Sequence, residues 1–311
     1  MNILINEDKL FSSDAIKTLQ KIGKIYTNKL PKNKTEIEII FVKLRDRIDS
    51  KFLNNYINLK YIVCPTTSIT HIDQETCKAK KIKIIKLNKD DIKLNAITST
   101  AELTINLILN LKRKTHKSYF DLKSGKKLSR YDYIGDSLNN LTIGIIGMGR
   151  IGSMVAKMSN AFNMKIIAFD KYKKLQLPRY IKQVDDINYL FKFSDIISLH
   201  ISEMEENHDF ITSSLLMKCK KKPLFINTSR GEFVDENALL KALNNGLLSG
   251  IGLDVTKNEY SKNRLNKTYN AHLKKNMIIT PHIGGCTLNE MKLTEEIVCK
   301  KLLSIIKQNE I

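Results

Sequence analysis

A glycine-rich turn between an apolar strand and a helix constrains the fold of this chain more than any other feature. An apolar run at 141–146 leads into three glycines in G-x-G-x-x-G spacing. In such a turn the first glycine permits the bend, the second lets the backbone approach a pyrophosphate, and the third lets the helix pack on the sheet. The phosphates then lie at a helix N-terminus. The cofactor contacts predicted from this turn are Gly147, Gly149, Arg150, Ile151 and Gly152.

A second apolar strand, 165–169, supports the same interpretation. Asp170 follows this strand, 18 residues after Gly152. An acidic side chain there can accept hydrogen bonds from the ribose hydroxyls of adenosine and would repel a 2′-phosphate. The sequence therefore predicts NAD, rather than NADP, as the cofactor. The alternative is a glycine turn followed by an unrelated aspartate. A strand, a turn, a helix and an acidic residue in this order make that alternative less favoured.

Length and composition limit the classes to which the chain can belong. The 311 residues suit two domains of ordinary size. The five cysteines are scattered without C-x-x-C spacing, so neither a disulfide framework nor a metal site is expected. No secretion signal and no apolar run of membrane-spanning length is present, so we expect a cytoplasmic protein without a membrane partner.

The net charge of +20 raises the question of a nucleic-acid partner. The lysines are distributed along the whole chain, without interleaved aromatic residues or a helix-turn-helix pattern. The chain is also rich in Lys, Asn and Ile together, as an AT-biased coding sequence would produce. We therefore interpret the charge as solvated surface and expect no nucleic-acid binding.

Alternating strands and helices indicate an α/β fold. Residues 1–95 alternate apolar strands with helical stretches, and the alternation resumes after residue 141. Between them, a capping box at 99–102 predicts a long buried helix, and 115–140 is expected to be an irregular segment that links or lies across a neighbouring subunit. Strands are predicted near 3–5, 37–42, 59–63, 82–85, 165–169, 195–200, 224–227, 250–255 and 277–281. Asp235 is expected to cap a helix that Gly246 ends.

Three side chains near predicted strand ends in the second half of the chain could carry chemistry. Ligands of open parallel sheets bind outside the carboxyl ends of the strands. Arg230 could hold a carboxylate through two parallel hydrogen bonds. Glu259 and His282 could form an acid/base pair, in which the carboxylate fixes the imidazole tautomer and stabilises its protonated form. Singly, each could be an ordinary surface or capping residue, but together they supply what hydride transfer to a 2-oxo acid requires.

These motifs strongly resemble those of the D-isomer-specific 2-hydroxyacid dehydrogenases over nearly the full length. Besides the glycine turn, the matching segments are 194–200, 227–231, 252–255 and 281–285. The resemblance implies two doubly wound parallel-sheet domains, with a Rossmann NAD domain inserted into a flavodoxin-like substrate domain. It places the NAD domain at 96–287 and the substrate domain at 1–95 and 288–311. The further cofactor contacts that it implies are His200, Thr228, Ser229, Asp254, Gly284 and Gly285.

The expected substrate loop departs from the family pattern. The family loop is glycine-rich and ends in Asn-Ile-Asp, whereas this chain has Pro-Thr-Thr-Ser-Ile-Thr-His-Ile-Asp at 65–73. Thr67 and Ser68 still offer hydrogen-bond donors to a substrate carboxylate. Arg45 is a candidate contact for a larger anionic substrate, and a solvated basic run is an equal alternative.

The resemblance implies an NAD-dependent oxidoreductase that interconverts a D-2-hydroxy acid and its 2-oxo acid. Arg230 would bind substrate, His282 would act as the acid/base and Glu259 would tune it. A homodimer through the NAD domain is the implied assembly. Two alternatives stay open at this point: an NAD-gated binding protein of the same family, and an enzyme similar to formate dehydrogenase. The second has an amide where this chain has Glu259, which argues against it.

Overall fold

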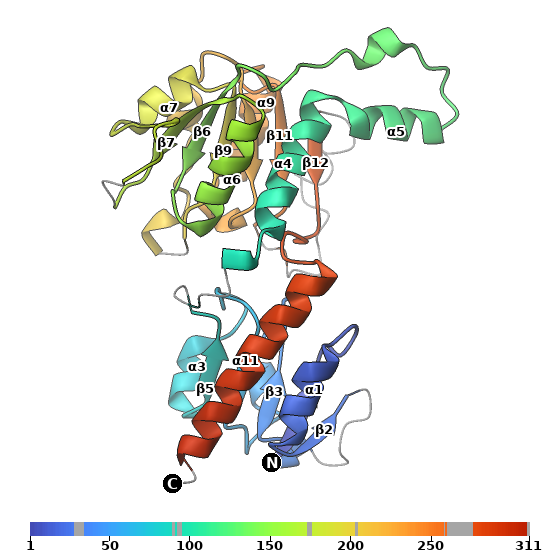
Figure 1. Cartoon of the computed structure of the whole chain (residues 1–311), viewed down its shortest axis with the longest axis vertical. Coiled ribbons are helices and arrows are strands. Elements are labelled where there is room, and N and C mark those ends of the chain that lie inside the picture. Colours follow the sequence, from blue (N-terminus) through green and yellow to red (C-terminus); the bar gives the residue numbers. More distant parts are fainter. Residues whose placement is uncertain are drawn as a thin grey trace. The chain divides into compact units, whose positions relative to one another are not determined.

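The chain forms two compact units. The computed structural model describes residues 1–27, 34–88, 91, 95–172, 176–202, 205–257, 259 and 276–309. Unit 1 comprises Met1–Ile97 and Gly285–Ile311, and unit 2 comprises Thr98–Gly284 (Figure 1). Unit 2 is therefore inserted into unit 1 in chain order. Each unit contains one parallel sheet with helices, which confirms the predicted fold class.

Unit 1 contains a five-stranded sheet in the order β2-β1-β3-β4-β5. This is the flavodoxin-like arrangement of a doubly wound sheet. Its three central strands are largely apolar because helices cover both faces of the sheet. The strands are β1 (Asn2–Ile5), β2 (Lys24–Tyr26), β3 (Ile39–Phe41), β4 (Tyr61–Cys64) and β5 (Lys83–Lys86).

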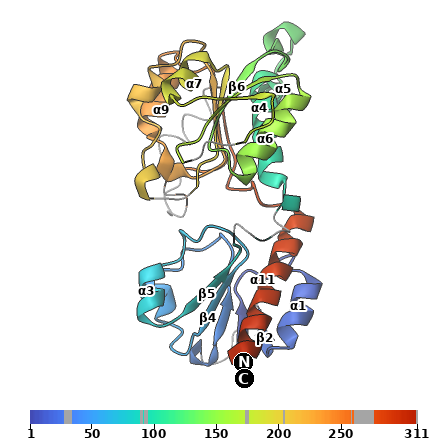
Figure 2. The ribbon, with the colours of Figure 1, turned by 60° about the vertical axis from the view of Figure 1, so that its left-hand side comes forward.

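Helices pack on both faces of the unit 1 sheet (Figure 2). Helices α1 (Ser13–Gln20) and α11 (Leu288–Asn309) enclose one core, to which Leu19 and Leu302 contribute. Helices α2 (Ser50–Leu53) and α3 (Gln74–Ala79) cover the other core, with Leu53 and Cys77. The 3-10 helix η1 (Lys34–Glu36) precedes β3. The last helix of the chain is thus part of the N-terminal fold.

Unit 2 contains a seven-stranded parallel sheet in the order β12-β11-β10-β9-β6-β7-β8. Beginning at β6, the chain first moves toward β8, then returns to β9 and continues toward β12. The order therefore reverses between β6 and β9, and such a reversal marks the ligand crevice of a Rossmann fold. The strands are β6 (Thr142–Ile146), β7 (Lys165–Phe169), β8 (Ile181–Gln183), β9 (Ile196–Leu199), β10 (Leu224–Asn227), β11 (Gly250–Leu253) and β12 (Met277–Ile279).

Helices also cover both faces of the unit 2 sheet. One core includes residues of α4 (Ser99–Lys112) and α6 (Arg150–Ala161). The other includes residues of α7 (Ile187–Phe193), α8 (Ser213–Leu216) and α9 (Glu236–Asn244). Two short 3-10 helices, η4 (Glu205–Asn207) and η5 (Gly231–Phe233), lie in the connections.

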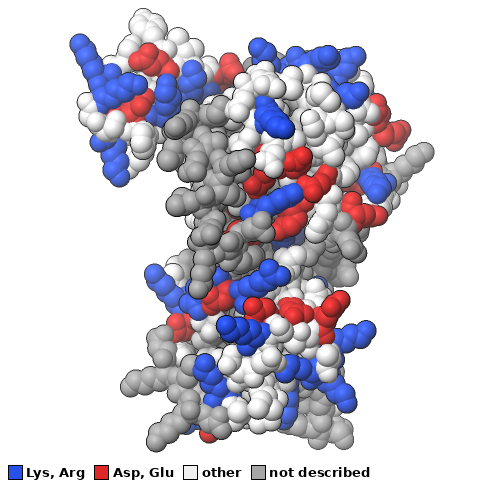
Figure 3. All heavy atoms as spheres, turned by 180° about the vertical axis from the view of Figure 1, so that it is seen from behind, with Lys and Arg blue, Asp and Glu red and all other residues white. Residues whose placement is uncertain are grey.

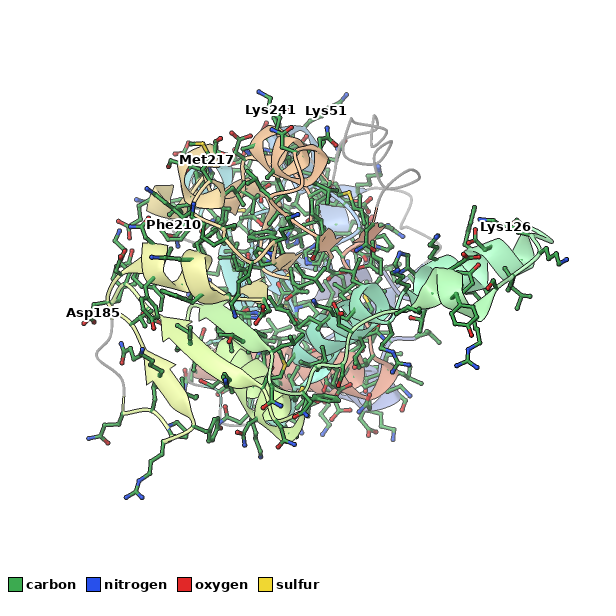
Figure 4. All side chains as sticks on the ribbon, turned by 90° about the horizontal axis from the view of Figure 1, so that it is seen from above. Lys51, Lys126, Asp185, Phe210, Met217 and Lys241 are labelled. Atoms are coloured by element: carbon green, nitrogen blue, oxygen red, sulfur yellow. The ribbon has the colours of Figure 1, made fainter. Side chains whose placement is uncertain are left out.

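Two predictions about residues 99–140 are wrong. The first residue of α4 is Ser99, so its N-cap is Thr98 rather than Ser99, and the Thr98 hydroxyl donates to the Glu102 carboxylate over 2.5 Å. The segment 115–140 is not irregular throughout, because it contains α5 (Thr115–Lys123) and the 3-10 helix η3 (Arg130–Tyr133). This segment projects from unit 2, and Lys126 lies toward its far end (Figures 1 and 4).

Other local predictions agree with the structure. Asp235 caps α9 by accepting a hydrogen bond from the Ala238 amide, and Gly246 follows the helix in a left-handed conformation with φ of 69°. Among the described residues, no helix is both long and apolar enough to cross a membrane. Basic side chains are dispersed over the face in Figure 3, with acidic side chains among them.

Candidate active site in unit 2

The glycine turn after β6 has the shape that the sequence predicts. Gly147 has φ of +90°, and a Cβ there would lie 2.6 Å from the carbonyl oxygen of His200. A Cβ on Gly152 would lie 2.1 Å from the Gly147 carbonyl oxygen. A Cβ on Gly149, by contrast, would meet nothing within 4 Å. The protein's own packing thus requires Gly147 and Gly152, whereas Gly149 leaves open space beside the first residues of α6, Arg150 and Ile151. That space fits a pyrophosphate.

Asp170 follows β7 and its side chain bonds to the glycine turn. Its Oδ2 accepts a hydrogen bond from the Met148 amide over 2.9 Å, and its Oδ1 accepts one from the Tyr172 amide over 3.1 Å. A carboxylate has about four acceptor positions. Asp170 can therefore hold the turn and still accept the ribose hydroxyls of an adenosine. Lys171, next to it, pairs with Glu206 at 3.8 Å.

His200 directly follows β9, and its side chain is neutral. Its Nε2 lies 2.7 Å from Ser198 Oγ, and its amide donates to the Ile146 carbonyl over 2.7 Å. Burial lowers the pKa of His200 to about 3, because the imidazolium loses its hydration. His200 is therefore uncharged at neutral pH and is not suited to donate a proton there.

The loop after β10 holds Arg230 in a network of hydrogen bonds. Asn227 donates through Nδ2 to the Arg230 carbonyl over 2.8 Å and accepts from the Ser229 amide over 2.9 Å. Ser229 Oγ donates to the Ile201 carbonyl over 2.8 Å. Arg230 Nη1 donates to the Ser229 carbonyl over 2.6 Å, and its buried Nε has no acceptor among the described residues. A buried charged donor is costly to leave unpaired, so this guanidinium is suited to an anionic ligand.

The two side chains of the predicted acid/base pair are in contact. His282 Nδ1 lies 2.7 Å from Glu259 Oε1, and the two side chains are 20% and 17% exposed. His282 adopts a left-handed backbone conformation with φ of 55°. Its amide donates to the Asp254 carbonyl over 2.8 Å. The pair thus joins the segments that follow β11 and β12, which are neighbours in the sheet.

Asp254 and the two glycines after His282 shape the His282 segment. Asp254 Oδ1 accepts from Thr280 Oγ1 over 2.6 Å and from the Ile283 amide over 2.8 Å. Its Oδ2 accepts from the Gly284 amide over 2.7 Å, and a Cβ on Gly284 would come within 2.9 Å of that oxygen. A Cβ on Gly285 would meet nothing within 4 Å. In this structure the Asp254 carboxylate therefore binds the segment that carries His282.

Sequence reasoning missed Thr104, which supports the loop of Arg230. Thr104 Oγ1 lies 2.8 Å from Thr228 Oγ1, and both side chains are buried. Thr104 comes from α4, far from the loop in sequence. The available signal was a threonine among the mostly apolar residues on the buried face of α4, because a buried hydroxyl needs a partner.

Apart from Arg230, the predicted substrate contacts lie in unit 1. Thr67 is exposed and Ser68 is half-buried in the loop after β4. Arg45 follows β3, and its guanidinium bonds to Asp46 Oδ2 through Nε at 3.0 Å and Nη2 at 2.8 Å and donates to the Asn6 carbonyl. Arg45 is thus already paired with a carboxylate. No cluster of three or more metal-ligating side chains occurs within the described ranges.

Comparison with known proteins agrees with this geometry. Residues 105–284 match the model of the D-isomer specific 2-hydroxyacid dehydrogenase, NAD binding domain. A glyoxylate reductase of Thermococcus litoralis is 34% identical over 280 residues, 88% of this chain and 81% of the relative. A hydroxypyruvate reductase of Thermotoga maritima is 33% identical over 254 residues, 81% and 79% of the two chains.

A solved structure also matches both units. The D-lactate dehydrogenase of Aquifex aeolicus, complexed with NAD and lactic acid, has a TM-score of 0.82 and 28% identity, and the match covers 99% of this chain and 96% of that one. The predicted cofactor, NAD, is therefore confirmed, as is the expected reaction class. The chain belongs to the D-isomer-specific 2-hydroxyacid dehydrogenase family of NAD-dependent oxidoreductases.

Proposed function

We propose that this protein interconverts a small 2-oxo acid and the D-2-hydroxy acid, with Arg230, Glu259 and His282 as its catalytic residues. The observation that carries the proposal is the hydrogen bond between His282 Nδ1 and Glu259 Oε1. Arg230 follows β10, Glu259 follows β11 and His282 follows β12, and these three strands are consecutive in the sheet. Because carboxyl ends of parallel strands meet at one edge, the three residues belong to the same edge.

Arg230 is the proposed anchor for the substrate carboxylate. A guanidinium can form two parallel charge-assisted hydrogen bonds with a carboxylate, which fixes the orientation of the adjacent carbonyl. The buried Nε without an acceptor supports this role. The substrate contacts proposed from unit 1 are Thr67 and Ser68, and Arg45 only for a substrate with a second anionic group.

His282 is the proposed proton donor and acceptor. With Nδ1 bonded to Glu259, Nε2 is the nitrogen that exchanges a proton with the substrate oxygen. In reduction, the protonated imidazole gives its proton to the carbonyl oxygen as the carbonyl carbon accepts a hydride. In oxidation, the neutral imidazole takes the hydroxyl proton back. Glu259 stabilises the charged imidazolium in both directions.

NADH, when bound, supplies the hydride. The residues proposed to hold it are the glycine turn, Arg150, Ile151 and Asp170, together with those at the other strand ends: His200, Thr228, Ser229, Asp254, Gly284 and Gly285. Since unit 2 contains all of these except Gly285, we assign it as the NAD domain and unit 1 as the substrate domain. The relatives named glyoxylate reductase and hydroxypyruvate reductase support a short, unbranched 2-oxo acid as substrate.

We further propose a cytoplasmic homodimer that forms through the NAD domain. The cysteines are all free thiols, as a reducing compartment would maintain them. Residues 115–140, called the α5 segment below, project from unit 2 and carry exposed apolar side chains, which a second copy could cover.

Turnover with a panel of 2-oxo acids tests the proposed function. NADH oxidation should be observed with glyoxylate, hydroxypyruvate or pyruvate, and the product should be the D-hydroxy acid by chiral chromatography. Tight NADH binding without turnover of any of these acids would favour the NAD-gated binding protein instead. The variant His282→Ala, assayed in parallel, shows whether observed turnover depends on this site.

A further inference from the structure

A row of buried side chains lies beneath the loop after β4, and the proposed chemistry does not use it. Cys64 is 0% exposed and His71 is 1% exposed. Cys64 Sγ lies 3.1 Å from Thr66 Oγ1 and 3.8 Å from His71 Nε2. Thr66 Oγ1 donates to the Ser68 carbonyl over 2.5 Å. These contacts connect both ends of the loop to its middle.

The direction of each hydrogen bond follows from the number of protons available. A threonine hydroxyl has one proton, and that of Thr66 goes to the Ser68 carbonyl, so Thr66 Oγ1 accepts from the Cys64 thiol. The thiol proton is then used, and the sulfur can only accept from His71 Nε2–H. Burial raises the pKa of Cys64 to about 11, so the thiol keeps its proton at neutral pH. The result is a relay from His71 through Cys64 and Thr66 to Ser68.

Backbone bonds tie the relay residues to neighbouring segments of unit 1. The Thr66 carbonyl accepts from the Leu87 amide over 3.1 Å, and the His71 carbonyl accepts from the Ile48 amide over 2.7 Å. The exposed Thr67 lies between the two bonded residues of the turn, Thr66 and Ser68. No glycine occurs between residues 65 and 73.

We propose that this relay sets the shape of the substrate loop, so that Cys64, Thr66 and His71 are positioning residues that present Thr67 and Ser68 to the substrate carboxylate. The inference rests on the proposed function, because it takes the loop as a substrate contact. In this proposal the relay residues take no part in the transfer of the proton or the hydride. Their loss should therefore weaken substrate binding more than it slows the chemical step.

Thr66→Val tests the relay directly, because valine keeps the branched shape without the hydroxyl. We expect KM for the 2-oxo acid to rise about tenfold, with kcat within about threefold of the wild-type value and NADH affinity unchanged. Cys64→Ala should shift KM in the same direction. Thr66→Ser, which restores the hydroxyl, should return KM to the wild-type value. The matched control is Cys77→Ala, which removes another buried thiol from the same core and should leave KM unchanged.

Two results would overturn the relay. One is a Thr66→Val enzyme with the KM of Cys77→Ala, and the other is an equal loss of kcat, NADH affinity and thermal stability, which would indicate general damage.

If the wild-type enzyme reduces no 2-oxo acid, the proposed function fails, and hydrogen–deuterium exchange of residues 65–73 still tests the relay. Thr66→Val should then accelerate exchange in that loop and Cys77→Ala should not.

Discussion

At the scale of single residues, the bond between His282 and Glu259 makes a prediction about pH. Glu259→Gln removes, with little change in volume, the negative charge that stabilises the protonated imidazole during reduction. The alkaline limit of 2-oxo acid reduction should move downward, while NADH affinity stays the same. His282→Ala should lower kcat by a factor of about 10² to 10⁴.

A carboxylate elsewhere in unit 2 provides the control for that experiment. Asp195 accepts a hydrogen bond from the Thr142 amide over 2.8 Å and pairs with Lys221, before β9 begins. Asp195→Asn should leave the pH profile of reduction unchanged. If Glu259→Gln also leaves it unchanged, Glu259 does not tune the proton donor.

Arg230 makes a second prediction at this scale. Arg230→Lys keeps the positive charge but cannot form two parallel hydrogen bonds with a carboxylate. Steady-state kinetics should show kcat/KM falling on the order of 100-fold, about 3 kcal/mol, with folding and NADH affinity preserved. The exposed Arg179 gives a matched control, Arg179→Lys. Near-normal kcat/KM in Arg230→Lys would place the carboxylate anchor elsewhere.

His200 predicts a pH dependence of stability rather than of catalysis. Its pKa is lowered to about 3 in the folded chain from 6.5, so the unfolded chain binds more protons between these values. The contribution of His200 to the free energy of unfolding is therefore constant above pH 6.5. It decreases as the pH falls, by about 2 kcal/mol at pH 5. Denaturant titration of His200→Asn should show a weaker fall between pH 7 and 5. An equally steep fall in the variant would mean that another group causes it.

The sequence was informative about the site where chemistry and backbone geometry impose a residue type. Gly147 and Gly152 could be recognised because a Cβ at either position would collide with a carbonyl oxygen. His282 could be placed with Glu259 because both follow apolar runs that predict strands. Thr104 and the relay of Cys64 could not, because a hydrogen bond between buried side chains leaves no periodic pattern in a single sequence.

At the scale of secondary-structure elements, strands with a continuous apolar run were predictable, the edge strands β5 and β12 among them, whereas the edge strands β2 and β8 were not. Every residue of β6 and β10 is buried, and both were expected from continuous apolar runs. The strands β2 and β8 have three residues each at sheet edges, where half the ladder is missing and an apolar run is not required. Helix α5 has no buried residue, so it lacks the amphipathic spacing that would predict it.

Two glycines in the turn from β6 into α6 should respond differently to substitution by alanine. Gly149 has φ of −75° and open space at its Cβ position, so Gly149→Ala should fold normally and yet weaken NADH binding, because the methyl group enters the phosphate space. Gly152→Ala places a Cβ 2.1 Å from a backbone oxygen and should lower the free energy of unfolding by about 1–3 kcal/mol. Fluorescence titration with NADH and thermal melts measure the two effects. Equal melting temperatures for both variants would contradict the argument.

At the scale of the whole molecule, the insertion of unit 2 into unit 1 brings a proposed catalytic residue close in sequence to a passage between the units. The chain passes between the units near residue 97 and again near residue 285, directly after the segment of His282. The proposed acid/base residue is thus close in sequence to the second crossing. Helix α11 then returns to pack with α1 in the first core. From the sequence, these domain boundaries could be predicted only through the family resemblance. Amino-acid composition does not change at the boundary near residue 285.

The α5 segment predicts the oligomeric state. Tyr119, Phe120 and Leu122 are 68%, 67% and 65% exposed on a helix that projects from unit 2, and so many large apolar side chains in one place indicate a contact surface. Light scattering should give twice the 35.7 kDa mass of the chain. Phe120→Ser with Leu122→Ser should shift the protein toward monomer, because each substitution removes apolar surface from the contact. Leu10→Ser, which changes an equally exposed leucine in unit 1, should leave the mass unchanged. A wild-type monomer, or a dimer that the double variant leaves intact, would rule out this surface.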